Sequence, residues 1–231
     1  MKRPLIINFK NYVEISAEKT IQLANTAQKI ADKLEAEVVL APPQPSIAIV
    51  IQNVKIPVLC QHVDDAKMGS TTGFFIPEMA KSYGAAGSLI NHSEHRLDYK
   101  TINNLVQRLF QLNMTSIVCA RTPYEVEEIA KFSPNFIAIE PPELIGSGKA
   151  VSKEKPFIII DSLKAVAKYS KSTKVICGAG IMDRNDVASA VQLGADGILV
   201  ASGVVKASCW SEKISELASG FDERSDSPKI K

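Results

Sequence analysis

Residues 174–200 read KVICGAGIMDRNDVASAVQLGADGILV and contain one complete structural unit. The stretch begins and ends with short apolar runs, Lys174–Cys177 and Gly197–Val200. Runs without polar alternation are typical of strands that are buried on both faces of a parallel sheet. Between them, Asp183–Leu193 begins with an aspartate suited to an N-cap and carries apolar residues at helical spacing. The stretch therefore predicts a strand, a helix and a second, parallel strand.

The same unit recurs along the whole chain. The apolar runs are Leu5–Phe9, Val38–Ala41, Pro57–Cys60, Ser88–Ile90, Ser116–Cys119, Phe136–Ile139, Lys174–Cys177 and Gly197–Val200. Helical patterns lie between them, the clearest at Ser16–Leu34 and Asp98–Leu112, with a capping box at Thr122–Glu125. Eight such units predict a closed (β/α)₈ barrel that forms a single catalytic domain over residues 1–221. A doubly wound open sheet is the alternative.

Two segments do not fit this repeat. Phe157–Ile160 resembles a ninth strand, but Pro156 suits the first turn of a helix and the apolar residues that follow keep helical spacing. We therefore expect a helix there. The charged end of the chain, Asp222–Lys231, has no periodicity, and we expect a frayed tail.

Composition excludes several classes of protein. The chain has 231 residues, of which 45% are hydrophobic, so it can bury a large core. Its formal net charge of +2 does not indicate the basic surface that nucleic-acid binding requires. Four widely spaced cysteines, without zinc-ligand spacing, point to a reducing compartment. The apolar run Leu5–Ile7 is interrupted by Asn8 and Lys10 and is too short for a signal peptide. The longest apolar stretches, such as Ile47–Ile51, are too short for a membrane span, so we expect a cytoplasmic protein without membrane contacts.

Three polar side chains follow predicted strands at what should be one rim of the barrel. Lys10 follows the first strand, His92 the fourth and Glu140 the sixth. Each is an ordinary loop residue when taken alone. Together they supply a carboxylate base, an imidazole that can polarise a carbonyl, and a cation for developing negative charge. This combination is what enolisation requires.

Glycine-rich loops at the same rim are suited to binding an anion. They are Leu144–Gly148 and Cys177–Gly180, together with Ala201–Gly203. Glycines let backbone N–H groups approach an anion, and the loops after the seventh and eighth strands form a frequent phosphate site in such barrels. The sequence around Gly148-Lys149 is no P-loop, because Glu143 stands where the first glycine is needed.

Four motifs together resemble one enzyme family. They are Asn8–Lys10, Asn91–Arg96, Glu140–Lys149 and Gly194–Val200, each in the expected place relative to a strand. On these residues the chain resembles the triosephosphate isomerase family along nearly its whole length, its compact archaeal members above all. The resemblance implies a TIM barrel that interconverts D-glyceraldehyde 3-phosphate and dihydroxyacetone phosphate through a cis-enediolate, in glycolysis and gluconeogenesis.

The resemblance also implies a role for each matching residue. Glu140 would be the catalytic base, and a neutral His92 the electrophile. Asn8 and Lys10 would contact the substrate, and Glu94 would orient Lys10 and shuttle protons. Backbone N–H groups for the phosphate would come from Ile145, Gly146, Gly180, Ala201 and Ser202.

The chain departs from the wider family around the phosphate. Pro142-Glu143 replaces an aromatic residue near the start of the lid. Cys177–Gly180 lacks the usual serine, and Ala201-Ser202 stands where two glycines are usual. These changes resemble those of archaeal members, and they leave backbone donors as the phosphate contacts.

The predicted chemistry needs no metal and no organic cofactor. His62, Asp64 and Asp65 could be imagined as a metal cluster, but a solvated loop is the preferred interpretation. The expected partner is a triose phosphate. Gly69–Ile76, with its two phenylalanines, resembles the protruding loop that family members insert beside a neighbouring active site. We therefore expect a homotetramer, with a dimer as the alternative.

Two other functions remain open from the sequence. One is a sugar-phosphate lyase or synthase on the same barrel, although Lys174 lies at the wrong end of its strand for a Schiff base. The other is an inactive phosphate-binding barrel that serves as a ligand binder or a scaffold.

Overall fold

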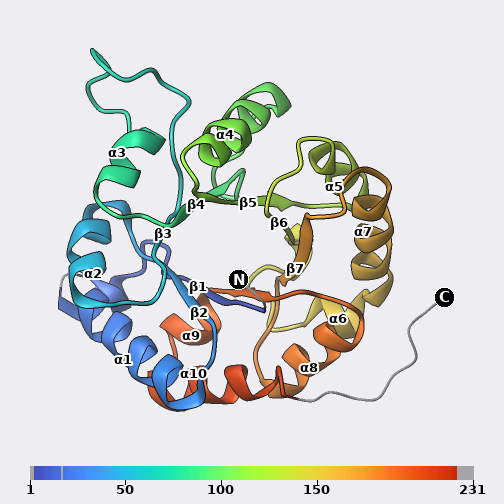
Figure 1. Cartoon of the computed structure of the whole chain (residues 1–231). Coiled ribbons are helices and arrows are strands. Elements are labelled where there is room, and N and C mark those ends of the chain that lie inside the picture. Colours follow the sequence, from blue (N-terminus) through green and yellow to red (C-terminus); the bar gives the residue numbers. More distant parts are fainter. Residues whose placement is uncertain (1–2, 17, 223–231) are drawn as a thin grey trace.

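The strands form a barrel that is surrounded by helices in the computed structural model, which describes residues 3–16 and 18–222 (Figure 1). The strands are β1 (Leu5–Asn8), β2 (Val38–Ala41), β3 (Leu59–Cys60), β4 (Gly87–Ile90), β5 (Thr115–Ala120), β6 (Phe136–Ile139), β7 (Lys174–Gly178) and β8 (Ile198–Val200). All of them are parallel, as the repeated strand–helix unit predicts.

The sheet runs almost completely around the barrel. Its order is β2-β1-β8-β7-β6-β5-β4-β3. The remaining join, between β2 and β3, is narrow: Leu40 forms a bridge with Val58, and its N–H donates to the carbonyl of Pro57 at 3.0 Å. The (β/α)₈ barrel is therefore confirmed, and the open sheet is excluded.

The helices lie where the sequence places them, with one difference at a cap. They are α1 (Glu18–Leu34), α2 (Ile47–Asn53), α3 (Pro77–Ser82), α4 (Tyr99–Gln111), α5 (Pro123–Ala130), α6 (Val151–Glu154), α7 (Pro156–Tyr169), α8 (Arg184–Gln192), α9 (Ser202–Val205) and α10 (Trp210–Ser219), with short 3₁₀ turns η1 (Val13–Ile15), η2 (Gln44–Ser46) and η3 (Pro142–Leu144). The segment that resembled a ninth strand is the start of α7, as expected. At α5, Thr122 accepts from the N–H of Glu125, but the Glu125 carboxylate returns to Arg121 rather than to Thr122. The predicted capping box is therefore only half formed.

Strand alternation separates two layers of core. On β6, Phe136 and Ala138 point into the barrel, whereas Ile137 and Ile139 point outward against the helices. Interior packing of this kind fills the barrel rather than leaving a pore. A residue that directly follows a strand and keeps the inward side of its alternation therefore points into the mouth of the barrel.

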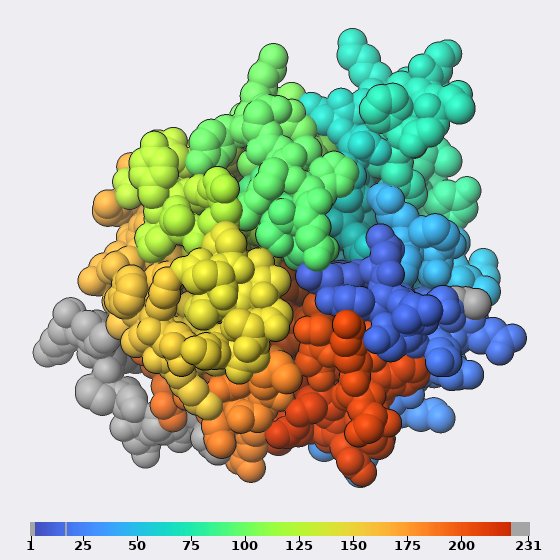
Figure 2. All heavy atoms as spheres, turned by 180° about the vertical axis from the view of Figure 1, so that it is seen from behind, coloured from blue at the N-terminus to red at the C-terminus, as the bar shows by residue number. Residues whose placement is uncertain are grey.

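The carboxyl ends of the strands open at the face shown in Figure 2. There the yellow segment that follows β6 lies beside the blue segment that follows β1 and the red segment that follows β8. Near the end of the described residues, Phe221 packs against the core. Of the expected frayed tail, residues 223–231 lie outside the described residues.

Candidate active site

Glu140 enters the mouth of the barrel because it continues the inward face of β6. Ala138 pairs with Cys119 on one side and with Ile176 on the other. Glu140 and Gly178 each lie two residues further along, on the same inward side, so they are close to each other. A Cβ added at Gly178 would lie 2.7 Å from Cγ of Glu140. The missing side chain at Gly178 is what makes room for the carboxylate.

The Glu140 carboxylate is buried and incompletely partnered. Its residue is 6% exposed, and Oε2 has no hydrogen-bond partner among residues 3–16 and 18–222. Burial raises the pKa of Glu140, while His92, the Cys119 thiol and Lys10 offset part of that effect. A raised pKa makes the ionised carboxylate a better proton acceptor. Glu140 is therefore suited to act as a general base.

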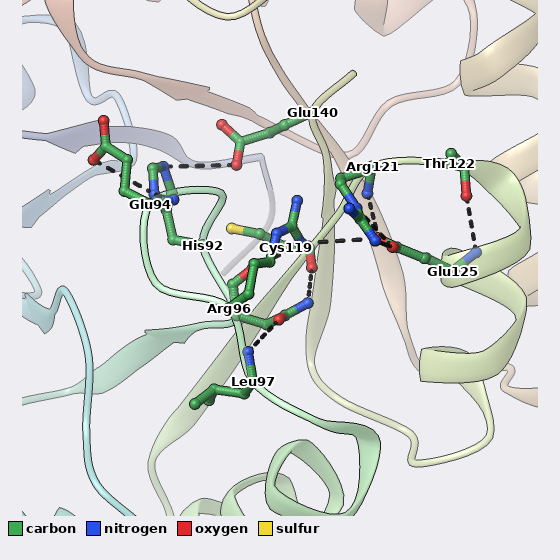
Figure 3. Close-up of polar contacts among 10 residues, drawn as sticks. His92, Glu94, Arg96, Leu97, Cys119, Arg121, Thr122, Glu125 and Glu140 are labelled. Atoms are coloured by element: carbon green, nitrogen blue, oxygen red, sulfur yellow. Dashed lines mark hydrogen bonds and ion pairs between the residues drawn. The ribbon is translucent and has the colours of Figure 1, made fainter. Parts of the chain in front are cut away.

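His92 stands between two carboxylates, as Figure 3 shows. Its Nε2 lies 3.8 Å from Oε2 of Glu140, which is too far for a hydrogen bond. Its Nδ1 accepts the backbone N–H of Glu94 at 3.2 Å, whereas the Glu94 carboxylate is 3.7 Å from the same nitrogen. The shorter contact comes from a donor, so Nδ1 carries no proton. The neutral ring then has its proton on Nε2, facing Glu140 and the cavity.

The turn that carries His92 is fixed by the residue before it. Asn91 has φ 59, a left-handed conformation that asparagine tolerates better than most residues. Its side chain donates to the carbonyl of Cys119 at 2.9 Å and accepts the N–H of Leu97 at 2.9 Å. Arg96 also donates to the Asn91 carbonyl, at 3.1 Å. The imidazole is thus positioned by bonds to β5 and to the following loop.

Lys10 supplies a cation at the same rim. Its Nζ donates to Oε1 of Glu94 at 2.8 Å, and its side chain is largely buried while Glu94 is exposed. Asn8, the last residue of β1, accepts the Lys10 N–H through Oδ1 at 3.0 Å. Asn8 therefore both lines the cavity and holds the backbone of Lys10.

One cavity of about 820 Å³ joins these groups to the glycine-rich loops. Its volume lies within the range of small-molecule sites. It is lined by Asn8, Lys10, His92, Glu140, Ile145, Gly146, Gly180, Ala201 and Ser202. Of the residues predicted from the sequence, Glu94 alone lies in the neighbouring hollow instead, where it shares Lys10 and His92 with the main cavity.

The lid, residues 141–150, covers one side of the cavity. It is held by η3, by the Ser147 hydroxyl donating to the Leu144 carbonyl at 2.8 Å, and by an ion pair between Glu143 and Lys155. The N–H of Ile145 donates to the carbonyl of Pro142 at 3.3 Å. Binding of a phosphate by this N–H therefore requires the turn to rearrange.

The end of the lid packs closely against the loop after β7. A Cβ at Gly180 would lie 1.8 Å from the carbonyl oxygen of Lys149, and Gly180 also has φ 71. Only glycine satisfies both conditions. The loop after β7 and the end of the lid are therefore in backbone contact at this point.

The cysteines differ from one another more than the sequence indicated. Cys60, Cys119 and Cys177 are all buried, but only Cys119 faces the barrel interior. Burial raises the pKa of the Cys60 thiol to about 12 and also raises the pKa of the Cys119 and Cys177 thiols, so none of the three is a ready nucleophile. Cys119 lies close enough to Glu140 to affect its pKa, a contact that the sequence analysis did not find.

Gln61 is a second residue that the sequence analysis missed. It donates to the carbonyls of Lys10 and Ala41 at 3.2 and 3.0 Å. Its position in the sequence was one signal of this role, because Gln61 lies two residues after Leu59, which points into the barrel from β3. The sequence suggested Gly178 only as part of an anion-binding turn, whereas the structure places it against the Glu140 carboxylate.

His62 and Asp64 form a local pair rather than part of a larger ligand set. His62 Nε2 lies 3.3 Å from Oδ1 of Asp64, and the His62 ring stacks on His95 with a centroid separation of 3.9 Å. Over the described ranges, three or more His, Cys, Asp or Glu side chains are nowhere grouped so that they could hold a metal ion. In the same ranges, every helix is too short or too polar to cross a membrane.

A buried carboxylate, an imidazole and an ammonium group that meet at the mouth of a (β/α)₈ barrel are suited to proton transfer next to a carbonyl group, and they indicate a barrel enzyme of that class. A family model described as triosephosphate isomerase matches residues 4–217. The chain belongs to the triosephosphate isomerase family and is an isomerase.

Relatives that carry the same name match almost the whole chain. A triosephosphate isomerase of Caldivirga maquilingensis is 45% identical over 94% of this chain and 97% of its own length. One of Cenarchaeum symbiosum is 46% identical over 93% of this chain and 96% of its own. One of Methanothermus fervidus is 41% identical over 94% and 98%, respectively. The similarity to compact archaeal members, expected from the motifs, is confirmed.

Proposed function

We propose that this chain interconverts D-glyceraldehyde 3-phosphate and dihydroxyacetone phosphate with Glu140 as the base, His92 as the electrophile and Lys10 as the stabilising cation. Glu140 removes a proton from the carbon next to the carbonyl, which gives a cis-enediolate. Nε2–H of His92 donates to the oxygens as negative charge develops, and Lys10 stabilises the same charge. Glu140 then returns the proton to the neighbouring carbon.

One observation carries this proposal: Oε2 of Glu140 is buried, unpartnered among the described residues, and 3.8 Å from Nε2 of His92. A structural carboxylate in such a place would be expected to have a hydrogen-bond partner. The space between the two atoms leaves the base free for a substrate proton and the imidazole free for a substrate oxygen. Glu94 supports this arrangement by holding Nζ of Lys10 and, through its N–H, Nδ1 of His92.

The phosphate of the substrate would bind at the opposite side of the cavity. Ala201 and Ser202 stand at the start of α9, where the helix dipole and the first N–H groups favour an anion. Gly180 contributes a loop N–H, and Ile145 and Gly146 contribute theirs after the lid has rearranged. Closure would keep water from the enediolate and prevent elimination of the phosphate.

The first test is a coupled assay of D-glyceraldehyde 3-phosphate isomerisation by the wild-type protein and by Glu140→Gln. Loss of a general base should reduce kcat by about 10²–10⁴-fold. Glu127→Gln is the matched control, because Glu127 lies on α5 beside Lys168 and Tyr169, away from the cavity. An inactive wild-type protein, or a fully active Glu140→Gln variant, would contradict the proposal.

The wider setting is also proposed. The barrel domain spans residues 1–221, and free thiols at all four cysteines favour the cytoplasm. The assembly is a homotetramer, with a dimer as the alternative, because the protruding loop visible beside α3 in Figure 1 exposes 57% of Phe74. Light scattering on the purified chain would distinguish the two masses.

The lyase and scaffold functions are not favoured. Lys174 begins β7, at the end of the barrel opposite Glu140, so it cannot form a Schiff base in the cavity. Oε2 of Glu140, buried without a hydrogen-bond partner among the described residues, destabilises the fold, and a pure scaffold would gain nothing from it.

A further inference from the structure

Gln61 connects three consecutive segments of the barrel rim. It lies just after β3, and its side-chain amide donates to two backbone carbonyls. One belongs to Lys10, in the turn after β1, at 3.2 Å; the other belongs to Ala41, the last residue of β2, at 3.0 Å. A single side chain thus ties the turn that carries Lys10 to the neighbouring strand.

The backbone of Lys10 needs such support. Its φ is 49, in the left-handed region that residues other than glycine rarely occupy. Strained conformations of this kind persist only where the surroundings hold them, and they gather at functional sites. The Lys10 N–H is held by Oδ1 of Asn8 at 3.0 Å, and the Lys10 carbonyl is held by Gln61. Both polar backbone groups of Lys10 are therefore fixed by side-chain amides.

The direction of the Lys10 side chain depends on this backbone conformation. From the left-handed turn, Nζ reaches Oε1 of Glu94 at 2.8 Å, next to His92. A change of φ to the ordinary right-handed or extended region would turn the Cα–Cβ bond and move Nζ away from the cavity. A displacement of about 1 Å at a catalytic group can cost about 10²-fold in rate.

We infer that Gln61 is a positioning residue for Lys10, holding its strained backbone so that the ammonium group faces the substrate. The inference rests on the role proposed above for Lys10. Gln61 acts through the Lys10 and Ala41 carbonyls, and its part in the reaction is to keep the cation in place.

The first experiment compares Gln61→Ala with the wild-type protein. We expect kcat/KM to fall about 10–100-fold, and the affinity for phosphoglycolate, whose carboxylate resembles the charge of the enediolate, to fall at least about tenfold in calorimetry. Gln44→Ala is the matched control, because Gln44 also donates one amide hydrogen bond to a carbonyl, that of His62, without touching Lys10. We expect it to stay within about twofold of wild type in both measurements.

The second variant, Gln61→Glu, separates positioning from simple packing. Its ionised carboxylate cannot donate to the two carbonyls, but its protonated form can donate to one of them. The ratio of its kcat/KM to that of the wild-type protein should therefore rise as the pH is lowered. A residue needed only for packing would give a ratio that does not change with pH, and this result would overturn the inference.

A crystal structure of Gln61→Ala gives a readout that does not depend on activity. We expect φ of Lys10 to leave the left-handed region and Nζ to leave Glu94. An unchanged Lys10 together with wild-type kcat/KM in Gln61→Ala would overturn the positioning role while leaving the isomerase function intact. An inactive wild-type protein would instead contradict the proposed function, whatever conformation Lys10 adopts.

Discussion

The end of β6 and the start of α8 each hold a buried carboxylate, yet the two are treated in opposite ways. Asp186 is 4% exposed, and both of its carboxylate oxygens have partners. They are Lys153 Nζ at 2.6 Å and the N–H groups of Met182 and Asp183 at 2.8 and 3.3 Å. Glu140 is 6% exposed, and its Oε2 has no hydrogen-bond partner in the described part of the chain. Similar burial therefore conceals different roles.

The surroundings of the two carboxylates indicate different roles. Asp186 closes the capping box of α8 with Asp183, and its Lys153 partner lies on α6, directly after the lid. It therefore stabilises the junction between α8 and the segment that follows residues 141–150. Glu140 is kept short of partners, so its basicity is available to a substrate. Buried polar groups are normally satisfied, and an exception at a cavity marks a functional group.

Among changes to the surroundings of the two carboxylates, filling the space beside Glu140 should have the largest effect. Gly178→Ala places a Cβ 2.7 Å from Cγ of Glu140, so the carboxylate must move. We expect kcat/KM to fall about 10²-fold, because a base displaced by about 1 Å no longer meets the substrate carbon. The melting temperature of the variant shows whether the loss is local. Wild-type kcat/KM in a folded Gly178→Ala protein would mean that the carboxylate does not need this space.

Removing the partnered carboxylate should weaken the fold. Asp186→Ala leaves the Met182 and Asp183 N–H groups and the Lys153 ammonium without their acceptor, which we expect to cost about 1–3 kcal/mol. For a chain of this length the melting temperature should drop by about 2–4 °C per kcal/mol. Asp161→Ala is the control, since its exposed pair with Lys164 contributes little. Equal melting temperatures for the two variants would refute the structural role of Asp186.

Replacing Glu140 should change stability in the opposite direction to Asp186→Ala, and by a smaller amount. Burial raises the pKa of Glu140 above its value of about 4.3 in an unfolded chain. Once the pH exceeds the raised pKa, the native state must hold a charge that the unfolded chain keeps in water, so the ionised group lowers stability. Glu140→Gln should therefore raise the melting temperature at neutral pH, by about 2–4 °C for each kcal/mol regained.

The stability difference between Glu140→Gln and the wild-type protein should also depend on pH. Below the unfolded-state pKa, both states hold a protonated Glu140, so the advantage of Glu140→Gln should disappear as the pH is lowered towards about 4. Scanning calorimetry of both proteins across this range checks the sign. A variant that is less stable than wild type at neutral pH would show that Glu140 has stabilising partners after all.

The barrel was predictable because its signal is local and repeated. Every strand is a short apolar run. Asp98 and Asp183 cap helices that are predicted by the spacing of their apolar residues. Even the start of α7 could be distinguished from a strand, since Pro156 belongs in a first helical turn. Small errors arose where a cap depended on side-chain choice, as when Glu125 turned to Arg121 instead of completing the box at α5.

The chemical residues were also predictable, but their partners were not. Lys10, His92 and Glu140 stand out in the sequence because polar groups follow buried strands at one rim. Gln61, Cys119 and Gly178 carry no such signal, since glutamine, cysteine and glycine are ordinary at strand ends. Their roles depend on register between neighbouring strands, which places Gly178 opposite Glu140 and Gln61 beside the Lys10 turn.

The amino-acid sequence by itself determined the order of strands and helices, the family, and which side chains could perform the chemistry. Those properties follow from periodicity, caps and residue type, all of which act over a few neighbouring residues. Only the tertiary structure sets the partners of each carboxylate: Oε2 of Glu140 has no hydrogen-bond partner among the described residues, whereas Asp186 has several. Burial, hydrogen bonding and the pKa that they set arise from groups far apart in the chain, so they exist only once the barrel has closed.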